Sequence, residues 1–233
     1  MAVVKPFRAV RPAKDRAESV AALPYDVMNR KEAAQMAAGN PCSFLHISRS
    51  EIDLPEVKDP YDRSVYEKAK ENIERNLKDG VFIEEDRPAL YIYRQQMNGR
   101  YQTGIAGCVS IDDYENNIIK KHEFTRVEKE IDRINHFDVC NTNTEPVFLT
   151  YRDNLQIRTL IEGYIQGHEP EYDFVGKDGV GHTLWVIEDD SVVNALCQLF
   201  DRVPDFYIAD GHHRSASACK VGELRRKQHP DYT

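Results

Sequence analysis

The chain has 233 residues, which is enough for one large domain or two small ones. Hydrophobic residues make up 41% of it and supply a core, while the 30% of charged residues are interspersed and argue against disorder. The net charge of −8 disfavours nucleic acid as a partner, because a surface that coats nucleic acid is basic. No apolar run approaches the ~20 residues that cross a bilayer, so we expect no membrane segment.

The five cysteines form an odd set without a C-x-x-C pair. This pattern disfavours a disulfide framework and is typical of a protein from a reducing compartment. The first residues, MAVVKPFRAVRPAKDR, combine a proline with charges where a signal peptide would have its apolar core. We therefore expect a cytoplasmic protein.

The N-terminal third predicts two helices and a short strand. Asn29 begins a helix that runs to about residue 38 and is closed by Gly39, and SFLHIS (43–48) is a strand candidate. A second helix is expected from Asp59 as its N-cap to a stop at Gly80, with Pro60 in its first turn. Its apolar residues recur every four positions and predict one buried stripe: Tyr61, Val65, Ala69, Ile73 and Leu77.

The rest of the chain mixes hairpins and helices. Asn98-Gly99 is the turn signal of a hairpin over 89–111, and a second hairpin over 172–190 turns at 176–179. Further helices are expected over 125–137, 154–166, 190–203 and 212–227, and further strands over 116–121, 146–153 and 205–209. This order predicts an α+β fold with a mixed sheet, antiparallel hairpins and packed helices.

The segment KHEFTRVEKEIDRINHF combines a helical pattern with many charges. Thr125 and Glu128 have the spacing of a capping box, and Glu123 lies just before the helix. The helical period assigns the core face to Phe124, Val127, Ile131 and Ile134, and the opposite face to Arg126, Lys129, Arg133 and His136. The basic face is either a solvated stripe or a surface for an anion. In the latter case Glu123 could accept a proton from a hydroxyl nucleophile.

The stretch FYIADGHHRSASA (206–218) is the densest cluster of chemically useful residues. Gly211 permits a sharp turn where a strand meets a helix. The first N–H groups of a helix have no intrahelical partner and carry partial positive charge, which suits an anion. Arg214 adds a guanidinium that matches phosphate oxygens, and His212 and His213 add donors or acceptors. The stretch therefore predicts a phosphate site; the alternative is a tight turn in which Asp210 caps the helix.

Other motifs of phosphate, hydrolase or metal chemistry are missing. The sequence has no G-x-x-x-x-G-K-[ST] loop, no G-x-G-x-x-G after a strand and no G-x-S-x-G elbow. HEFTR, from His122, places Arg126 where a zinc protease needs its second histidine ligand. No metal ligands are therefore assigned.

Six motifs in one order carry a resemblance over essentially the whole chain: KPFRAVRP, LPYDV, SFLHISR, LYIYRQQ, KKHEFTR and YIADGHHR. Together they resemble a widespread bacterial family of cytosolic proteins of unknown function. Members usually continue beyond the point where this sequence stops, so we expect a C-terminally truncated chain. The role of the Tyr25-Asp26 pair in LPYDV is not assigned.

The order HE, helix, apolar strand and DGHHR is distantly similar to the ParB/sulfiredoxin superfamily, which includes free serine kinases. That resemblance implies a glycine turn ending in an arginine, opening a helix that holds nucleotide phosphates. Sulfiredoxins carry Gly-Cys-His-Arg there, and His212 in place of that cysteine disfavours sulfinic-acid repair. The serine kinases carry a DGHHR-like motif and an upstream glutamate base, which implies Asp210 to Arg214 and Glu123 in these roles.

The resemblance thus implies nucleotide-dependent phosphoryl transfer to a small hydroxyl metabolite, with free L-serine as the best candidate acceptor. Glu123 and His212 are the expected catalytic residues. The nucleotide, ATP or ADP with Mg²⁺, is expected to contact Asp210, Gly211, His212, His213, Arg214 and Arg126. The alternative is a ParB-like nucleotide switch or interaction module without turnover.

The resemblance to the ParB/sulfiredoxin superfamily also implies a division into domains. An N-terminal α+β segment would take residues 1–85, and a ParB/sulfiredoxin-like core would take residues 86–233 with an insert at about 152–204. In compact members of the superfamily the connection replaced by this insert is short. The insert could therefore cover or reshape the site.

Overall fold

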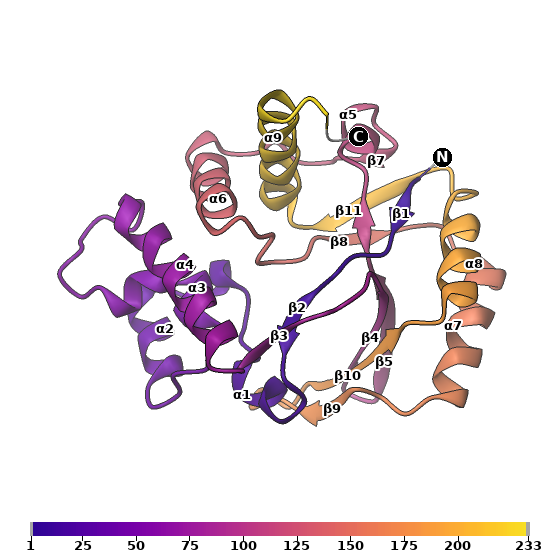
Figure 1. The fold of residues 1–233 in the computed structure, drawn as a ribbon, viewed down its shortest axis with the longest axis horizontal. Helices are drawn as coiled ribbons and strands as arrows, with labels where there is room; N and C mark the ends of the chain where they lie inside the picture. The colour runs from indigo at the N-terminus through magenta and orange to yellow at the C-terminus, as the bar shows by residue number, and fades with distance from the viewer. Residues whose placement is uncertain (1, 232–233) are drawn as a thin grey trace. The chain divides into compact units, whose positions relative to one another are not determined.

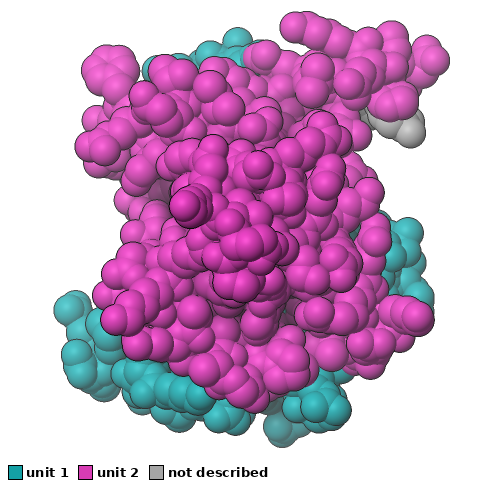
Figure 2. Space-filling model, turned by 90° about the vertical axis from the view of Figure 1, so that its left-hand side faces the viewer, with its two compact units in different colours: residues 1–18, 83–120, 149–207 teal, residues 19–82, 121–148, 208–233 magenta. Residues whose placement is uncertain are grey.

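The computed structural model describes residues 2–231, and it confirms a mixed α+β fold. The chain divides into two units built from interleaved segments (Figure 2). Unit 1 takes residues 1–18, 83–120 and 149–207, and unit 2 takes residues 19–82, 121–148 and 208–233. No helix within residues 2–231 is both long and apolar enough to cross a membrane. The sequence-based division at residue 85 stays a prediction.

Unit 1 contains a four-stranded antiparallel sheet in the order β5-β4-β10-β9. β4 (Leu90–Met97) and β5 (Arg100–Ala106) form the first predicted hairpin. Both turn residues, Asn98 and Gly99, have the positive φ that a tight hairpin turn requires. β9 (Tyr172–Val175) and β10 (Gly181–Ile187) form the second, so both hairpins are confirmed.

Unit 1 also contains short strands and helices outside this sheet, and two of these strands, β1 and β6, pair with each other. Those that lie wholly in the unit are β1 (Val4–Lys5), β2 (Val10–Pro12), η1 (Lys14–Arg16), β6 (Cys108–Val109), α5 (Ile111–Glu115), β7 (Ile119–Lys120), α7 (Leu155–Gly167) and α8 (Asp190–Phe200). Four elements run from one unit into the other: α1 (Ala17–Val20), β3 (Phe82–Glu84), β8 (Phe148–Thr150) and β11 (Phe206–Asp210). β11 is the central strand of the sheet β7-β11-β8, and it leads the chain into unit 2.

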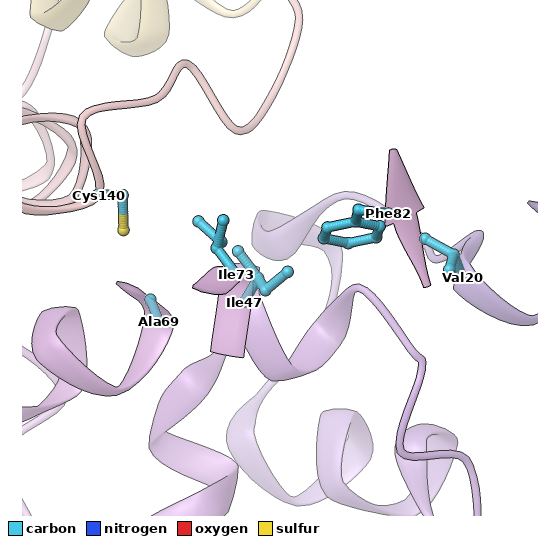
Figure 3. Packing of buried hydrophobic residues seen from close by; sticks show 6 residues of the cluster. All are labelled: Val20, Ile47, Ala69, Ile73, Phe82 and Cys140. Carbon is cyan, nitrogen blue, oxygen red and sulfur yellow. The ribbon is translucent and has the colours of Figure 1, made fainter. Parts of the chain in front are cut away.

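Unit 2 is helical. It holds η2 (Tyr25–Val27), α2 (Arg30–Ala37), α3 (Leu45–Ser48), η3 (Ser50–Asp53), α4 (Arg63–Lys78), α6 (Val127–Cys140) and α9 (His212–Gln228). A buried cluster gathers side chains from several of these segments (Figure 3): Val20, Ile47, Ala69, Ile73, Phe82 and Cys140. α6 and α9 lie side by side (Figure 1), which brings α6 to the helix that begins within the DGHHR motif.

Three predictions in the N-terminal third were wrong. SFLHIS forms the helical turn α3 instead of a strand, because the Ser43 hydroxyl accepts the Leu45 backbone N–H and starts the turn. α4 begins at Arg63, with Asp62 rather than Asp59 as its N-cap. The predicted stripe is buried at Val65, Ala69 and Ile73 and partly buried at Leu77, whereas Tyr61 precedes the helix and is exposed.

The predicted faces of α6 were wrong. Val127 and Ile131 are exposed, whereas Arg133 and His136 are buried with relative exposures of 4% and 2%. Buried partners explain the reversal: the Arg133 guanidinium pairs with Asp132 and lies over the Tyr25 ring, and His136 Nε2 contacts the Ile47 carbonyl at 3.1 Å. Polar side chains can occupy the inner face of a helix when they have such partners.

The predicted capping box at the start of α6 was also wrong. Arg126 holds the N-cap position without a side-chain cap. The Thr125 hydroxyl instead donates to Glu130 Oε2 at 2.6 Å. Glu130 is buried, so Thr125 serves an internal carboxylate rather than the helix end.

Candidate functional site

The DGHHR motif forms a strand, a turn and a helix start, as predicted. β11 ends at Asp210, Gly211 has the left-handed backbone angles φ 92° and ψ 35°, and α9 begins at His212. A Cβ at Gly211 would lie 3.0 Å from Nε of Arg214, which is tighter than ordinary contacts. The position therefore needs glycine for both its conformation and its space.

Arg214 is built into this turn. Its side chain is buried, Nη1 donates to the Pro146 carbonyl at 2.5 Å, and Nη2 pairs with the Asp210 carboxylate. Asp210 is thus the partner of Arg214 rather than a cap for α9, whose N-cap is Gly211 without a side-chain bond. Both terminal nitrogens of Arg214 are engaged, so the residue orients the turn, and a phosphate would compete with Asp210 for it.

His212 lies inside the site and connects it to the segment before α6. The ring is buried and meets the His122 ring edge to face, with centroids 4.3 Å apart. Nδ1 of His212 lies 3.7 Å from Oε2 of Glu123, whose side chain is mostly exposed. Burial and the neighbouring His122 lower the pKa of His212, which favours a neutral ring at pH 7. Its buried Nε2 has no hydrogen-bond partner in the described part of the chain.

His213 makes the second connection to that segment. Its Nε2 accepts the backbone N–H of Arg126 at 3.0 Å. Burial, together with the positive charges of Lys129 and Arg126, lowers the pKa of His213, so the neutral ring keeps this acceptor. The structure therefore brings Glu123 to His212 and Arg126 to His213, and the residues of each pair are 87 or more positions apart in the sequence.

A buried polar network behind this site joins α6 to α9. The Ser217 hydroxyl donates to the Glu130 carbonyl at 3.1 Å, and Lys220 pairs with the Glu130 carboxylate. Burial raises the pKa of Glu130, but hydrogen bonds from Lys220 and Thr125 outweigh it and leave the pKa lowered. Glu130 is thus held as a carboxylate. Sequence reasoning missed this contact, because no motif links residues so far apart.

A second group of charged residues in the same unit was also missed. Glu145 is 8% exposed, and neither carboxylate oxygen has a hydrogen-bond partner among the residues described. Burial raises its pKa to about 7, although Arg133 and Arg214 lower it. The Arg133 guanidinium lies 4.1 Å from the centroid of the Tyr25 ring. LPYDV was the only sequence signal here, because the helical period placed Arg133 on the wrong face.

The residues around the Gly211 turn, including Glu123, offer two chemical functions. The N–H groups at the start of α9 and the two histidines suit phosphate oxygens, because helix N-termini stabilise anions. The exposed Glu123 carboxylate beside neutral His212 suits proton acceptance. A Mg²⁺ ion carried by nucleotide phosphates fits this arrangement. Direct ligation by Asp210 would require breaking its pair with Arg214.

Comparison with protein-family models matches residues 4–233 to a family described as proteins of unknown function, DUF1015. Searches of curated proteins and of solved structures gave no match. The match covers nearly all of the chain, so it shows the family, and it carries no activity with it.

Proposed function

The chain belongs to the DUF1015 family of unknown function, and from its own site we propose that it transfers a phosphoryl group from ATP or ADP to a small hydroxyl metabolite. Free L-serine is the best candidate acceptor. The distant similarity of HE and DGHHR to free serine kinases of the ParB/sulfiredoxin superfamily supports this choice.

One observation carries the proposal. Glu123, which the similarity implies as the base, lies 3.7 Å from His212 at the helix start that it implies as the phosphate site. The two residues are far apart in the sequence, and nothing in local structure requires them to meet. Their proximity unites a proton acceptor and an anion site, which phosphoryl transfer needs.

In the proposed step the serine hydroxyl oxygen attacks the terminal phosphorus of the nucleotide. The new P–O bond forms as the bond to the leaving phosphate breaks, giving phosphoserine with ADP from ATP or AMP from ADP. Glu123 takes the hydroxyl proton, and the neutral His212 ring lies beside that carboxylate at 3.7 Å. Gly211, His213 and the first N–H groups of α9 hold the phosphates, with Arg126 beside them, and bound Mg²⁺ would neutralise phosphate charge.

A second candidate function is a nucleotide-dependent interaction module of ParB type. One observation favours it: apolar side chains are exposed next to the site, with Phe124 at 102%, Val127 at 67% and Ile131 at 52%. Exposed apolar patches often mark interaction surfaces. In this case the nucleotide would control docking of a partner on that face.

Calorimetry and phosphorus NMR separate the two functions. The protein is titrated with ATP, ADP, CTP and tripolyphosphate in the presence of Mg²⁺, and each nucleotide is then incubated with L-serine. The kinase proposal expects tripolyphosphate to bind and a phosphoserine signal to grow with ATP or ADP. Preference for CTP without phosphoserine would instead support the module, and binding of no phosphate compound would contradict both.

A further inference from the structure

The group around Glu145 is not used by the proposed reaction, although it contains the least satisfied charges in unit 2. Both Glu145 oxygens and Nη1 of Arg133 are buried without a hydrogen-bond partner within residues 2–231. Burying a polar or charged group without a partner is costly, so such groups in native proteins have a reason. The two side chains are of opposite sign and lie close enough that each shifts the pKa of the other.

The surrounding contacts define which atoms of each side chain still lack a hydrogen-bond partner. Nε and Nη2 of Arg133 both donate to Asp132, at 3.0 and 2.9 Å, so only Nη1 remains. Arg214 is occupied by Asp210 and Pro146. The unsatisfied set is therefore one carboxylate that needs a donor and one guanidinium nitrogen that needs an acceptor.

This pairing matches neither kind of simple ion completely. A metal cation would meet Arg133 and Arg214, and a phosphate would meet Glu145, so each brings like charges together. A zwitterion avoids both conflicts, because its ammonium group can donate to Glu145 and its carboxylate can accept from Arg133. Free α-amino acids carry these two groups on one carbon.

We propose that Glu145 and Arg133 bind the ammonium and carboxylate groups of a free amino acid, with Tyr25 forming one wall of the site. This inference rests on the proposed function, because it supplies the acceptor subsite. The Glu145 loop continues directly into Pro146, whose carbonyl holds Arg214 of the DGHHR motif. Tyr25 is fixed in turn, since Arg49 Nη1 donates to its carbonyl at 3.3 Å.

The proposed site also predicts that protons are released when the amino acid binds. The charged groups around it are Arg133 and Asp132 on α6, Arg214 on α9 and Asp26 on η2. Burial keeps the pKa of free Glu145 at about 7, so part of the population is protonated at neutral pH. An incoming ammonium group favours the ionised form, so binding at pH 7 should release a fraction of a proton.

The test pairs ligands with variants. Calorimetry at pH 7 measures binding of L-serine, 3-hydroxypropionate, which lacks the ammonium, and L-serine methyl ester, which lacks the free carboxylate. On the unmodified protein each analogue should bind at least 10-fold more weakly than L-serine. Glu145→Gln should weaken L-serine by a similar factor and leave 3-hydroxypropionate unchanged. Glu128→Gln, an exposed change on α6, is the matched control and should have no effect.

The unmodified protein also provides a test that is independent of folding of the variants. L-serine titrations in two buffers of different ionisation enthalpy should show proton release on binding. Equal affinity for all three ligands, or no proton release, overturns the inference. If phosphoserine forms under those outcomes, the proposed reaction stands and only this acceptor site is wrong. Discrimination among the three ligands without any phosphoserine would support the site and contradict the reaction.

Discussion

The backbone N–H of Arg126 donates a 3.0 Å hydrogen bond to Nε2 of His213. This bond ties the segment that carries Glu123 to the helix start that follows Gly211. It joins the two halves of the proposed active site directly, and it requires the His213 ring to be neutral at Nε2. The lowered pKa of His213 meets that requirement at neutral pH.

Replacing His213 should therefore loosen residues 121–126. His213→Leu removes the acceptor, so the Arg126 amide should exchange its hydrogen faster, and turnover should fall with it. His213→Gln offers an oxygen acceptor on a side chain of similar reach and should restore part of the protection. Hydrogen exchange measured by NMR checks both. Equal exchange rates in all three proteins would show that this bond does not hold the segment.

Gly211→Ala should disturb the phosphate site beyond its cost in stability. A residue with a Cβ at this positive φ costs about 1–2 kcal/mol. The new Cβ would also push the Arg214 guanidinium, which lies within 3.0–3.3 Å of it. Tripolyphosphate affinity should fall by about 10-fold.

Gly80→Ala is the matched control for that change. Gly80 has a φ of 70°, and its Cβ would meet nothing within 4 Å. It should lose similar stability in urea unfolding and keep its tripolyphosphate affinity. Equal affinities in the two variants would mean that the Gly211 turn does not touch the phosphate.

The reversed faces of α6 predict an unusual order of stabilities. Ile131→Gln should change the free energy of unfolding by about 0.5 kcal/mol or less, because the side chain is half exposed. Arg133→Gln should cost about 3 kcal/mol or more, because it leaves Asp132 without its buried partner. Urea unfolding of the two variants measures both values. A larger loss for Ile131→Gln would contradict the assignment of the faces.

Prediction from the sequence succeeded where the signal is local and failed for α6, where it is not. Local signals sufficed for both hairpins, for the positions of α2 and α8 and for the start of α9, because each depends on neighbours in the chain. The orientation of α6 depends on distant partners, such as Tyr25 for Arg133 and Ile47 for His136, and periodicity contains no information about them. The candidate site divides in the same way. DGHHR was recognised as a motif in the sequence, whereas Glu145 and Glu130 were identified only from their burial and contacts in the folded structure.

Glu145 should make stability depend on pH. Its pKa rises from an ordinary value of 4.5 to about 7 in the folded protein, so the folded state binds the proton more tightly. The stability it contributes is full below about pH 4.5 and is lost as the pH rises through 7. Glu145→Gln cannot ionise. The stability of this variant relative to the unmodified protein should therefore be greater at pH 8 than at pH 5, by on the order of 2–4 kcal/mol. Urea unfolding at the two pH values checks this, and a gain that is the same at both would show that Glu145 does not titrate in this range.

The most direct test of the proposed reaction compares the unmodified protein with Glu123→Gln. Both are incubated with L-serine, Mg²⁺ and ATP or ADP, and phosphoserine is followed by phosphorus NMR while calorimetry reports nucleotide affinity. The proposal predicts that Glu123→Gln binds nucleotide within about 3-fold of the unmodified protein and forms phosphoserine at least about 100-fold more slowly. Glu128→Gln should behave like the unmodified protein. The account is contradicted if the unmodified protein forms no phosphoserine with either nucleotide, or if Glu123→Gln forms it at an equal rate.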